Sequence, residues 1–551
     1  MSHMQLISNV KTIRERFDID VVERLLFTAI RRDSQPLVTP MLLRSVDGDR
    51  LVARQQETGN LVSAGMQPED LIQYEPWATI DARVTAGMSV AETLVDALEP
   101  LIQGGVLEVD DGVVFAHYRS LAERFRVGVA RSNPEPIYAY ELDESLVLEW
   151  FQEQRRVSNR VASRLVDEIP HLHGLSNHLN LELDTRFSSL KDLAHQMEVE
   201  ALLISAPPNF SELTGLEAHF GSHVLSLPGL ERIVLLTTTE RPEMESRGAG
   251  AFASLSEAVL QVAQTDRVAV EEQWISATSA IGLESVGVKL VDATDALARW
   301  RDARDCEDLG SQVVAARASV ICIEGALEYA KQKLAQGDSL TERDIYAKYL
   351  DLIVEFRRIH DISLSIEPYF ANLTASERML FPGPPTDHLI QPTTKCVQLD
   401  AGVQVSMNGV VLATSDMARS MPLTEEGERA YTILTNIVRG KIITSIRPGT
   451  VCEQVHATAM QALSEVRLEL ESAGVMASDV DFVSEYRKRN VGHLMGKQES
   501  FVTQFRPGDS HVLSVGAIGA AELPWRFGEY SLAAEDMWFI GADRTFITTL
   551  R

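Results

Sequence analysis

The sequence predicts an α+β protein made of three consecutive blocks. Its 551 residues are 45% hydrophobic and 24% charged, which is globular composition and long enough for several domains. Between residues 180 and 305, helical and strand-like patterns alternate, as is typical of an α/β layer with a partly parallel sheet. From residue 306 onward helical sequence comes first, and strands dominate beyond residue 396.

Charge and cysteine usage limit the classes of partner and compartment. With 51 basic and 79 acidic residues the formal net charge is −28, so the long-range field would repel nucleic acid and anionic membranes. The same charge is compatible with divalent metals and with a small neutral or cationic substrate. No apolar run of about 18 residues exists, so no membrane-spanning helix is predicted. Four scattered cysteines and a charged N-terminus without a signal peptide indicate a reduced, cytoplasmic protein.

The first block, residues 4–175, is expected to be an additional N-terminal domain of unknown role. Its pattern predicts helices over Val21–Arg32, Ser89–Glu99 and Ser145–Ile169, and a strand over Gly112–Ala116. The polar stretch that contains His171, His173 and His178 is interpreted as a solvated linker in preference to a metal site.

The second block, residues 180–305, predicts a smaller α/β domain. Its expected elements are helices over Ser188–Gln196 and Leu255–Ala263 and strands over Ala201–Ser205, Arg232–Leu236 and Arg267–Val270.

The third block, residues 306–551, predicts two helices and then a mainly β segment. Apolar spacing of three and four indicates a helix over Glu307–Leu334, and Ser339 with Glu342 predicts a capping box for the next one. One long helical stretch, Glu425–Ile446, interrupts the strands and ends at Arg447-Pro448-Gly449, and a further helix follows.

Two aspartates in this block stand inside strand-like sequence, where Asp is disfavoured. Asp400 and Asp416 flank the hairpin signal Asn408-Gly409, so we expect them on neighbouring strands, facing one spot. Two carboxylates that close would repel each other unless a proton or a cation lies between them. The alternative, surface carboxylates at strand ends, is left open by these residues alone.

Three further side chains complete a candidate ligand set. His493 lies beside Gly492, and Glu522 and Glu535 lie in strand-like apolar runs, where a buried carboxylate is costly without compensation. Oxygen ligands with one nitrogen suit Mn, Co, Zn or Fe. Taken alone, His493 is more readily interpreted as a structural or surface histidine than as a ligand.

These segments resemble the pita-bread hydrolases, the family of methionine aminopeptidase, Xaa-Pro aminopeptidase, prolidase and creatinase. The resemblance rests on Asp400-Ala401-Gly402, Ser415-Asp416-Met417-Ala418-Arg419-Ser420, Gly492-His493, the strand before Glu522, and Glu535-Asp536. It covers about residues 185–551 and implies a C-terminal pita-bread domain behind a creatinase-N-like α/β domain.

The resemblance also implies chemistry and assembly. Asp400 would chelate one divalent metal ion and His493, supported by Glu522, a second, while Asp416 and Glu535 would bridge the two. Such a pair lowers the pKa of a bridging water and polarises a carbonyl. The ions would be Mn, Co, Zn or Fe, the substrate a small peptide or other small molecule, and the protein a homodimer.

The sequence departs from the family pattern at several positions. The two aspartates are 16 residues apart, against the usual 11, and Gly383 and Ser500 stand where proline-specific members carry histidines. His388 or Glu499 would have to supply the missing acid–base help. A second alignment places Gly516 at the first glutamate position, although the distance to Glu535 favours Glu522.

The leading functional hypothesis is therefore a metallopeptidase-like hydrolase of the Xaa-Pro aminopeptidase or prolidase type, which cleaves a C–N bond with water activated by two metal ions. The missing histidines keep two alternatives open: an enzyme of the same fold that acts on a small specialised metabolite, or a non-catalytic peptide-binding member.

Overall fold

The structure is a computed structural model, and its described residues form two compact units. The described residues of one unit lie within 1–76, 89–152 and 184–301, and those of the other within 153–183 and 302–551. The predicted helix at Val21–Arg32 lies outside the described residues. These are 3–17, 40–55, 61, 66–76, 89–102, 104–130, 135–167, 169–179, 184–219, 221–241, 244, 248–378, 383–478, 481, 489–527 and 529–551.

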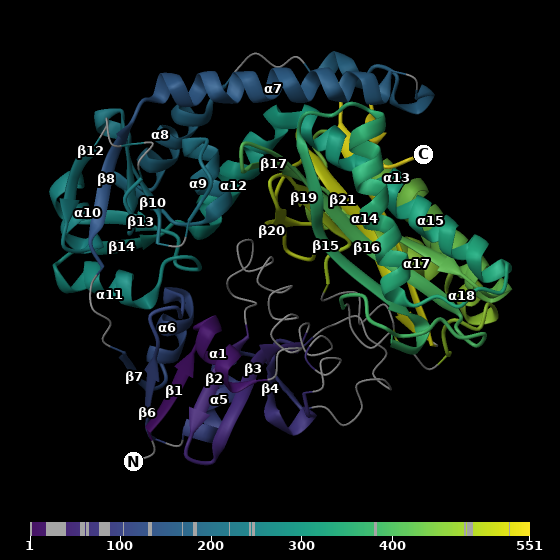
Figure 1. Cartoon of the computed structure of the whole chain (residues 1–551), viewed down its shortest axis with the longest axis horizontal. Helices are drawn as coiled ribbons and strands as arrows, with labels where there is room; N and C mark the ends of the chain where they lie inside the picture. Colours follow the sequence, from purple (N-terminus) through teal and green to yellow (C-terminus); the bar gives the residue numbers. More distant parts are fainter. Residues whose placement is uncertain are drawn as a thin grey trace. The chain divides into compact units, whose positions relative to one another are not determined.

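The first unit begins with a seven-stranded sheet in the order β5-β4-β3-β2-β1-β6-β7 (Figure 1). Buried Leu6 of β1 and Leu107 of β6 pack with Leu98 of α5 in its core. The strands are β1 (His3–Ile7), β2 (Met41–Ser45), β3 (Gly48–Arg54), β4 (Leu71–Tyr74), β5 (Val90–Ala91), β6 (Val106–Val109) and β7 (Arg126–Val129), and the helices α1 (Val10–Arg16), α5 (Leu94–Ile102) and α6 (Phe115–Ala122).

A second seven-stranded sheet of this unit has the order β12-β8-β11-β10-β9-β13-β14. Strands β9, β13 and β14 run parallel and the rest pair antiparallel, as the helix–strand alternation predicted. Leu203 of β9 faces one apolar core and Leu202 the other, so both faces of the sheet are buried. The strands are β8 (Ile137–Leu142), β9 (Ala201–Ile204), β10 (His223–Leu227), β11 (Arg232–Thr237), β12 (Gly248–Phe252), β13 (Arg267–Val270) and β14 (Lys289–Asp292), and the helices α8 (Arg186–Gln196), α9 (Pro207–Thr214), α10 (Leu255–Ala263), α11 (Ala277–Ser285) and α12 (Thr294–Asp305).

The boundary between the first two blocks differs from the expected one. Strand β8 pairs with β11 and β12, so the second sheet takes a strand from the segment assigned to the first block. Helix α7 (Glu144–Val166), the predicted helix at Ser145–Ile169, then runs from one unit into the other. Strand pairing between distant segments leaves no mark on local composition, which is why the sequence placed this boundary too late.

Two local expectations in the first block were wrong. The predicted strand Gly112–Ala116 is a single bridge, Val114 to Ser276, followed at once by helix α6. The expected linker around His171 forms two short 3₁₀ turns that bury Leu172 and Leu175, and His178 packs edge-on against Phe539 at 5.3 Å. Buried leucines between the polar residues hold this segment to the second unit.

The second unit contains two β-sheets. In the first, β16 (Cys396–Met407) pairs with β15 (Ser365–Ala375), β17 (Val410–Thr414) and β18 (Met417–Pro422). The second has the order β20-β19-β21-β22-β23. Its strands are β19 (Gly492–Met495), β20 (Glu499–Gln504), β21 (Ile518–Phe527), β22 (Tyr530–Ile540) and β23 (Thr545–Ile547).

Side-chain hydrogen bonds join the two sheets where β18 lies beside β22. Ser420 Oγ accepts a hydrogen bond from the Ala533 backbone N–H at 2.7 Å and donates one to the Ala533 carbonyl at 3.2 Å. Since β18 and β22 carry or adjoin the predicted acidic residues, this seam sets the distance between them.

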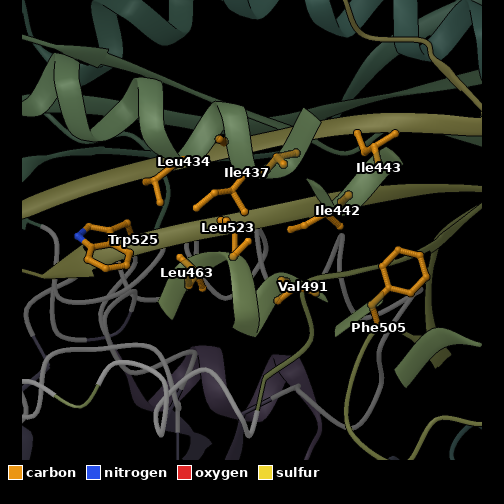
Figure 2. Packing of buried hydrophobic residues seen from close by; sticks show 14 of the residues in the cluster. Leu434, Ile437, Ile442, Ile443, Leu463, Val491, Phe505, Leu523 and Trp525 are labelled. Carbon is orange, nitrogen blue, oxygen red and sulfur yellow. The ribbon is translucent and has the colours of Figure 1, made fainter. Parts of the chain in front are cut away.

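Helices cover these sheets. α13 (Leu309–Ala335) packs on β16 to β18 and α14 (Glu342–Ile359) on β15, as the green ribbons of Figure 1 show. Leu434, Ile437 and Leu463 pack against Leu523 and Trp525 of β21 (Figure 2). The helices of this second layer are α15 (Glu425–Ile437), the π-turn η9 (Val438–Ile442), α16 (Ile443–Ser445), α17 (Cys452–Glu465) and α18 (Arg467–Ser472).

The capping box predicted for α14 lies two residues further along the chain. Thr341 caps the helix, and Asp344 closes the box. The Glu342 carboxylate is already bound to Arg378 and to the Thr386 hydroxyl, so it is not available to the cap.

Within the described part of the chain, none of the helices combines the length and the apolar character that a membrane-spanning segment requires.

Candidate metal centre

Asp400 and Asp416 lie close together at the junction of three strands. Asp400 sits in β16 opposite Ala418 of β18, and Asp416 directly precedes β18. Asn408 and Gly409 make the turn with φ of +53° and +81°, and β17 pairs with the outer part of β16. The wide spacing of the two aspartates is thus accommodated by an additional strand, and the predicted hairpin is present.

Gly402 makes this junction possible. A Cβ atom at this position would lie 1.8 Å from the Ser415 carbonyl oxygen, which no side chain tolerates. The Val403 backbone N–H donates to Ser415 Oγ at 2.9 Å and fixes the turn that carries Asp416.

His493 enters the cluster from β19, in the second sheet. Gly492, with φ of +142°, lets the chain pass within contact of Ala520, whose carbonyl would lie 2.3 Å from any Cβ. His493 Nδ1 lies 3.1 Å from the Leu494 carbonyl oxygen, which can only accept, so the proton is on Nδ1. In the neutral imidazole Nε2 would then carry the lone pair, and this atom lies 3.7 Å from Asp416 Oδ2 and 3.6 Å from Glu499 Oε1.

Glu522 and Glu535 are directly opposite each other on β21 and β22. Gly516, the alternative to Glu522, precedes β21 and donates its N–H to the Ile540 carbonyl at 2.8 Å. Strand pairing thus places Glu522, and not Gly516, beside Glu535.

Glu535 is the most deeply buried of the four predicted acidic ligands. It is 3% exposed, and its Oε1 has no hydrogen-bond partner in the described part of the chain. Burial raises the pKa of its carboxyl well above the ordinary value, and neighbouring carboxylates raise it further, those of Asp416, Glu522, Asp400 and Glu499. The predicted acids are therefore close enough to act electrostatically on the buried Glu535 carboxyl.

Two of these acids have partners that offset their charge. Asp400 Oδ2 accepts a hydrogen bond from the Asn372 amide at 3.1 Å. Glu522 Oε2 accepts one from the Arg489 guanidinium, also at 3.1 Å. No local sequence pattern marks Asn372 or Arg489, because only strand register and tertiary packing bring them to the acids.

The remaining side chains fit a metal ion. Asp416, His493 and Glu535 each offer one ligand atom, and these atoms lie within 4.8 Å of one another. Across the described ranges, this is the one such group of three, so the histidines at 171–178 do not form another. Two carboxylates and one imidazole suit first-row divalent metals, and the unpartnered Glu535 oxygen supplies a free ligand atom.

Next to Glu535 lies an ion-pair network that the sequence did not predict. Arg419 donates to Asp536 Oδ1 at 2.5 Å and to the Thr549 carbonyl at 3.0 Å, and Arg439 donates to Asp536 Oδ2 at 2.6 Å. Arg419 also donates to the Glu535 carbonyl. The network fixes the backbone of Glu535, and the arginine in the second aspartate motif was its one sequence signal.

The two positions at which the family carries further histidines provide no acid–base group here. Gly383 uses its carbonyl to accept the Leu373 N–H at 2.9 Å. Ser500 is fully buried and donates to Asp302 Oδ2 at 2.6 Å.

The two predicted substitutes differ in position. Glu499 lies beside His493 and acts electrostatically on Glu535. His388 lies by the first turn of α14, where its carbonyl accepts the Glu342 N–H at 3.1 Å, and it is not among the groups that shift the Glu535 pKa.

Comparison with known proteins agrees with this arrangement. Residues 314–541 match the model of metallopeptidase family M24. Every ligand candidate lies within this segment, and the resemblance to the pita-bread hydrolases is confirmed. No curated protein matches the sequence.

Solved structures share the fold of about two thirds of this chain at low identity. Prolidase from Pyrococcus horikoshii has a TM-score of 0.50 at 15% identity, over 67% of this chain and 98% of its own. Dipeptidase PepE from Mycobacterium ulcerans scores 0.50 at 16% identity, over 66% and 95%. The N-terminal domain of the FACT complex subunit SPT16 from chickpea (Cicer arietinum) scores 0.51 at 12% identity, over 66% and 95%. The structural similarity establishes the pita-bread fold, as predicted. The family match supports a hydrolase of the peptidase type.

Proposed function

We propose that this protein is a metal-dependent hydrolase that cleaves the C–N bond of a small peptide or amide at the carboxylate cluster within residues 314–541. The observation that carries the proposal is the buried Glu535 carboxylate, which lacks a donor on Oε1 within the described residues and is surrounded by further acids. Burying several carboxylates together is costly unless a cation offsets their charge.

The proposed site contains metal-binding residues and one acid–base residue. Asp416, His493 and Glu535 would hold the ion, and Nδ1 bonded to the Leu494 carbonyl keeps His493 in the ligand tautomer. A bound divalent metal supplies a water of lowered pKa and polarises the scissile carbonyl. Glu499, partly exposed and 3.6 Å from His493 Nε2, would take the proton of that water and pass it to the leaving amine. Such acid–base help contributes about 10²–10⁴-fold.

The finer expectations from the sequence belong to this proposal. They are Xaa-Pro specificity, manganese in preference to other first-row metals, a cytoplasmic homodimer, and a second ion held with the help of Asp400 and Glu522. The family match and the shared fold support a peptide substrate. Light scattering of the purified chain measures the oligomeric state.

The test is a metal-dependent cleavage assay on the full chain. Protein treated with chelator is assayed on Xaa-Pro dipeptides and tripeptides with and without Mn²⁺, beside Glu535→Gln. Glu529→Gln is the matched control, since Glu529 lies on the same hairpin with an 80% exposed side chain. Metal-dependent cleavage that Glu535→Gln abolishes and Glu529→Gln retains supports the proposal. No metal uptake by the wild type would refute it.

A second candidate follows from Gly383 and Ser500. Because one has no side chain and the other is hydrogen-bonded to Asp302, neither carries the proton as the family histidines do. This favours a different substrate, a small specialised metabolite. Metal uptake together with inactivity on every proline peptide would favour this candidate, and brisk cleavage of proline peptides would eliminate it. Retained peptide binding without cleavage or metal uptake would instead indicate the non-catalytic module.

A further inference from the structure

A permanent positive charge is bonded to Glu522, one of the acids beside the proposed metal site. The Arg489 guanidinium is 3.1 Å from Glu522 Oε2, and the two side chains are only 13% and 16% exposed. A guanidinium stays protonated at any working pH, and its hydrogen bond to a carboxylate is among the strong ones. Glu522 therefore has a cationic partner before any metal is bound.

Two acids of the cluster are hydrogen-bonded to neighbouring side chains, and the ligand atoms of two others lie close to His493. Asp400 and Glu522 are bonded to Asn372 and Arg489. The ligand atoms of Asp416, His493 and Glu535 lie within 4.8 Å of one another, and the buried Glu535 Oε1 has no donor among the described residues. Three ligand atoms are thus close enough to share one ion, while Glu522 already has a cationic partner.

Building on the metal site of the proposed function, we propose that Arg489 is a built-in cation of this cluster, and that the chain binds one divalent ion, between Asp416, His493 and Glu535. A second dication held by Glu522 would lie a few ångströms from the guanidinium in a poorly solvated place, where like charges repel strongly. Arg489 therefore limits the metal content of the site and distinguishes it from a two-ion centre.

Metal stoichiometry tests this directly, without an activity readout. The full chain is stripped with chelator and titrated with Mn²⁺ by calorimetry, and bound metal is counted by plasma mass spectrometry after desalting. The wild type is expected to bind one equivalent, and Arg489→Gln two, because Glu522 becomes available as a ligand. Arg489→Lys keeps the positive charge and is expected to stay at one.

Controls separate charge from misfolding. Arg467→Gln, which removes a half-exposed helical pair with Glu471, should leave one equivalent bound. Thermal unfolding of each variant shows whether it is folded. Should Arg489→Gln fail to fold, Arg489→Met, which also removes the positive charge, takes its place in the metal count with the same expected two equivalents.

The outcomes distinguish this inference from the proposed function. Two equivalents in the wild type, or one in a folded Arg489→Gln, overturn the role of Arg489 and leave a metal-dependent hydrolase standing. No Mn²⁺ bound to the wild type would refute the metal site itself. One equivalent in wild type and Arg489→Lys, with two in Arg489→Gln, supports the inference.

Discussion

Replacing Glu535 by glutamine should stabilise the metal-free protein, although it removes a proposed ligand. The ligand atoms of Asp416 and Glu535 lie within 4.8 Å of each other. At that separation two charges repel by about 3.5 kcal/mol at an effective dielectric constant of 20. The wild type relieves part of this by taking up a proton, so we expect the free energy of unfolding to rise by about 2–3 kcal/mol.

The pH dependence has a defined sign. The pKa of Glu535 is raised above its ordinary value of 4.5 in the folded state, first by burial and then by its acidic neighbours. A folded protein that binds the proton more tightly loses stability as pH rises through the folded pKa. The gain from Glu535→Gln should therefore grow from acid towards alkaline pH.

Scanning calorimetry in chelator provides the assay. For a unit of this size a gain of about 2–3 kcal/mol corresponds to a Tm higher by about 4–12 °C. Mn²⁺ at a hundred times its Kd should add about 2.7 kcal/mol to the wild type and nothing to the variant.

Glu522→Gln provides the opposite control. Its carboxylate is paired with Arg489, so its loss should lower the Tm. A lower Tm for Glu535→Gln in chelator, or an undiminished Mn²⁺ effect in that variant, would refute the reasoning about an uncompensated buried charge.

Three further outcomes follow from the structure. Gly492→Ala should destabilise the second unit by about 2–4 kcal/mol in thermal unfolding, since its Cβ would meet a carbonyl at 2.3 Å, whereas Gly440→Ala, with nothing within 4 Å, should be neutral or stabilising. Burial lowers the pKa of His223 to about 4, so stability should fall by about 3 kcal/mol as pH drops from 6.5 to 4, and a urea titration of His223→Gln should show a flatter profile. Asp536→Asn should be destabilising, because it leaves the buried Arg419 with Glu324 as its remaining carboxylate partner and removes the charge that Arg439 also contacts; equal midpoints in urea would contradict this.

Local sequence signals located many elements closely. The apolar spacing around Leu255–Ala263 predicted α10 with both of its ends, and Asn408-Gly409 predicted the hairpin between β16 and β17. The same signals failed where a distant partner decided the outcome. Glu342 was expected in a capping box and instead binds Arg378 across 36 residues.

The candidate site shows the same division. Asp400, Asp416, His493, Glu522 and Glu535 could be selected from the sequence, because carboxylates in apolar strands and a histidine after glycine are unusual. Their proximity could not be predicted from the sequence alone, since it depends on the seam between β18 and β22. There Ser420 is hydrogen-bonded to the Ala533 backbone. The Arg489 contact was also beyond reach, because nothing local links residue 489 to residue 522.

The sequence by itself therefore determined the fold class, the residue types available for chemistry and the family of the C-terminal domain, because strand, turn and helix preferences act over a few residues. Only the tertiary structure decided that Glu522 is paired with Arg489 and that Glu535 Oε1 has no donor within the described residues. That outcome depends on burial and on distances between strands far apart in the chain, and these set the electrostatic energy of every charge in the cluster.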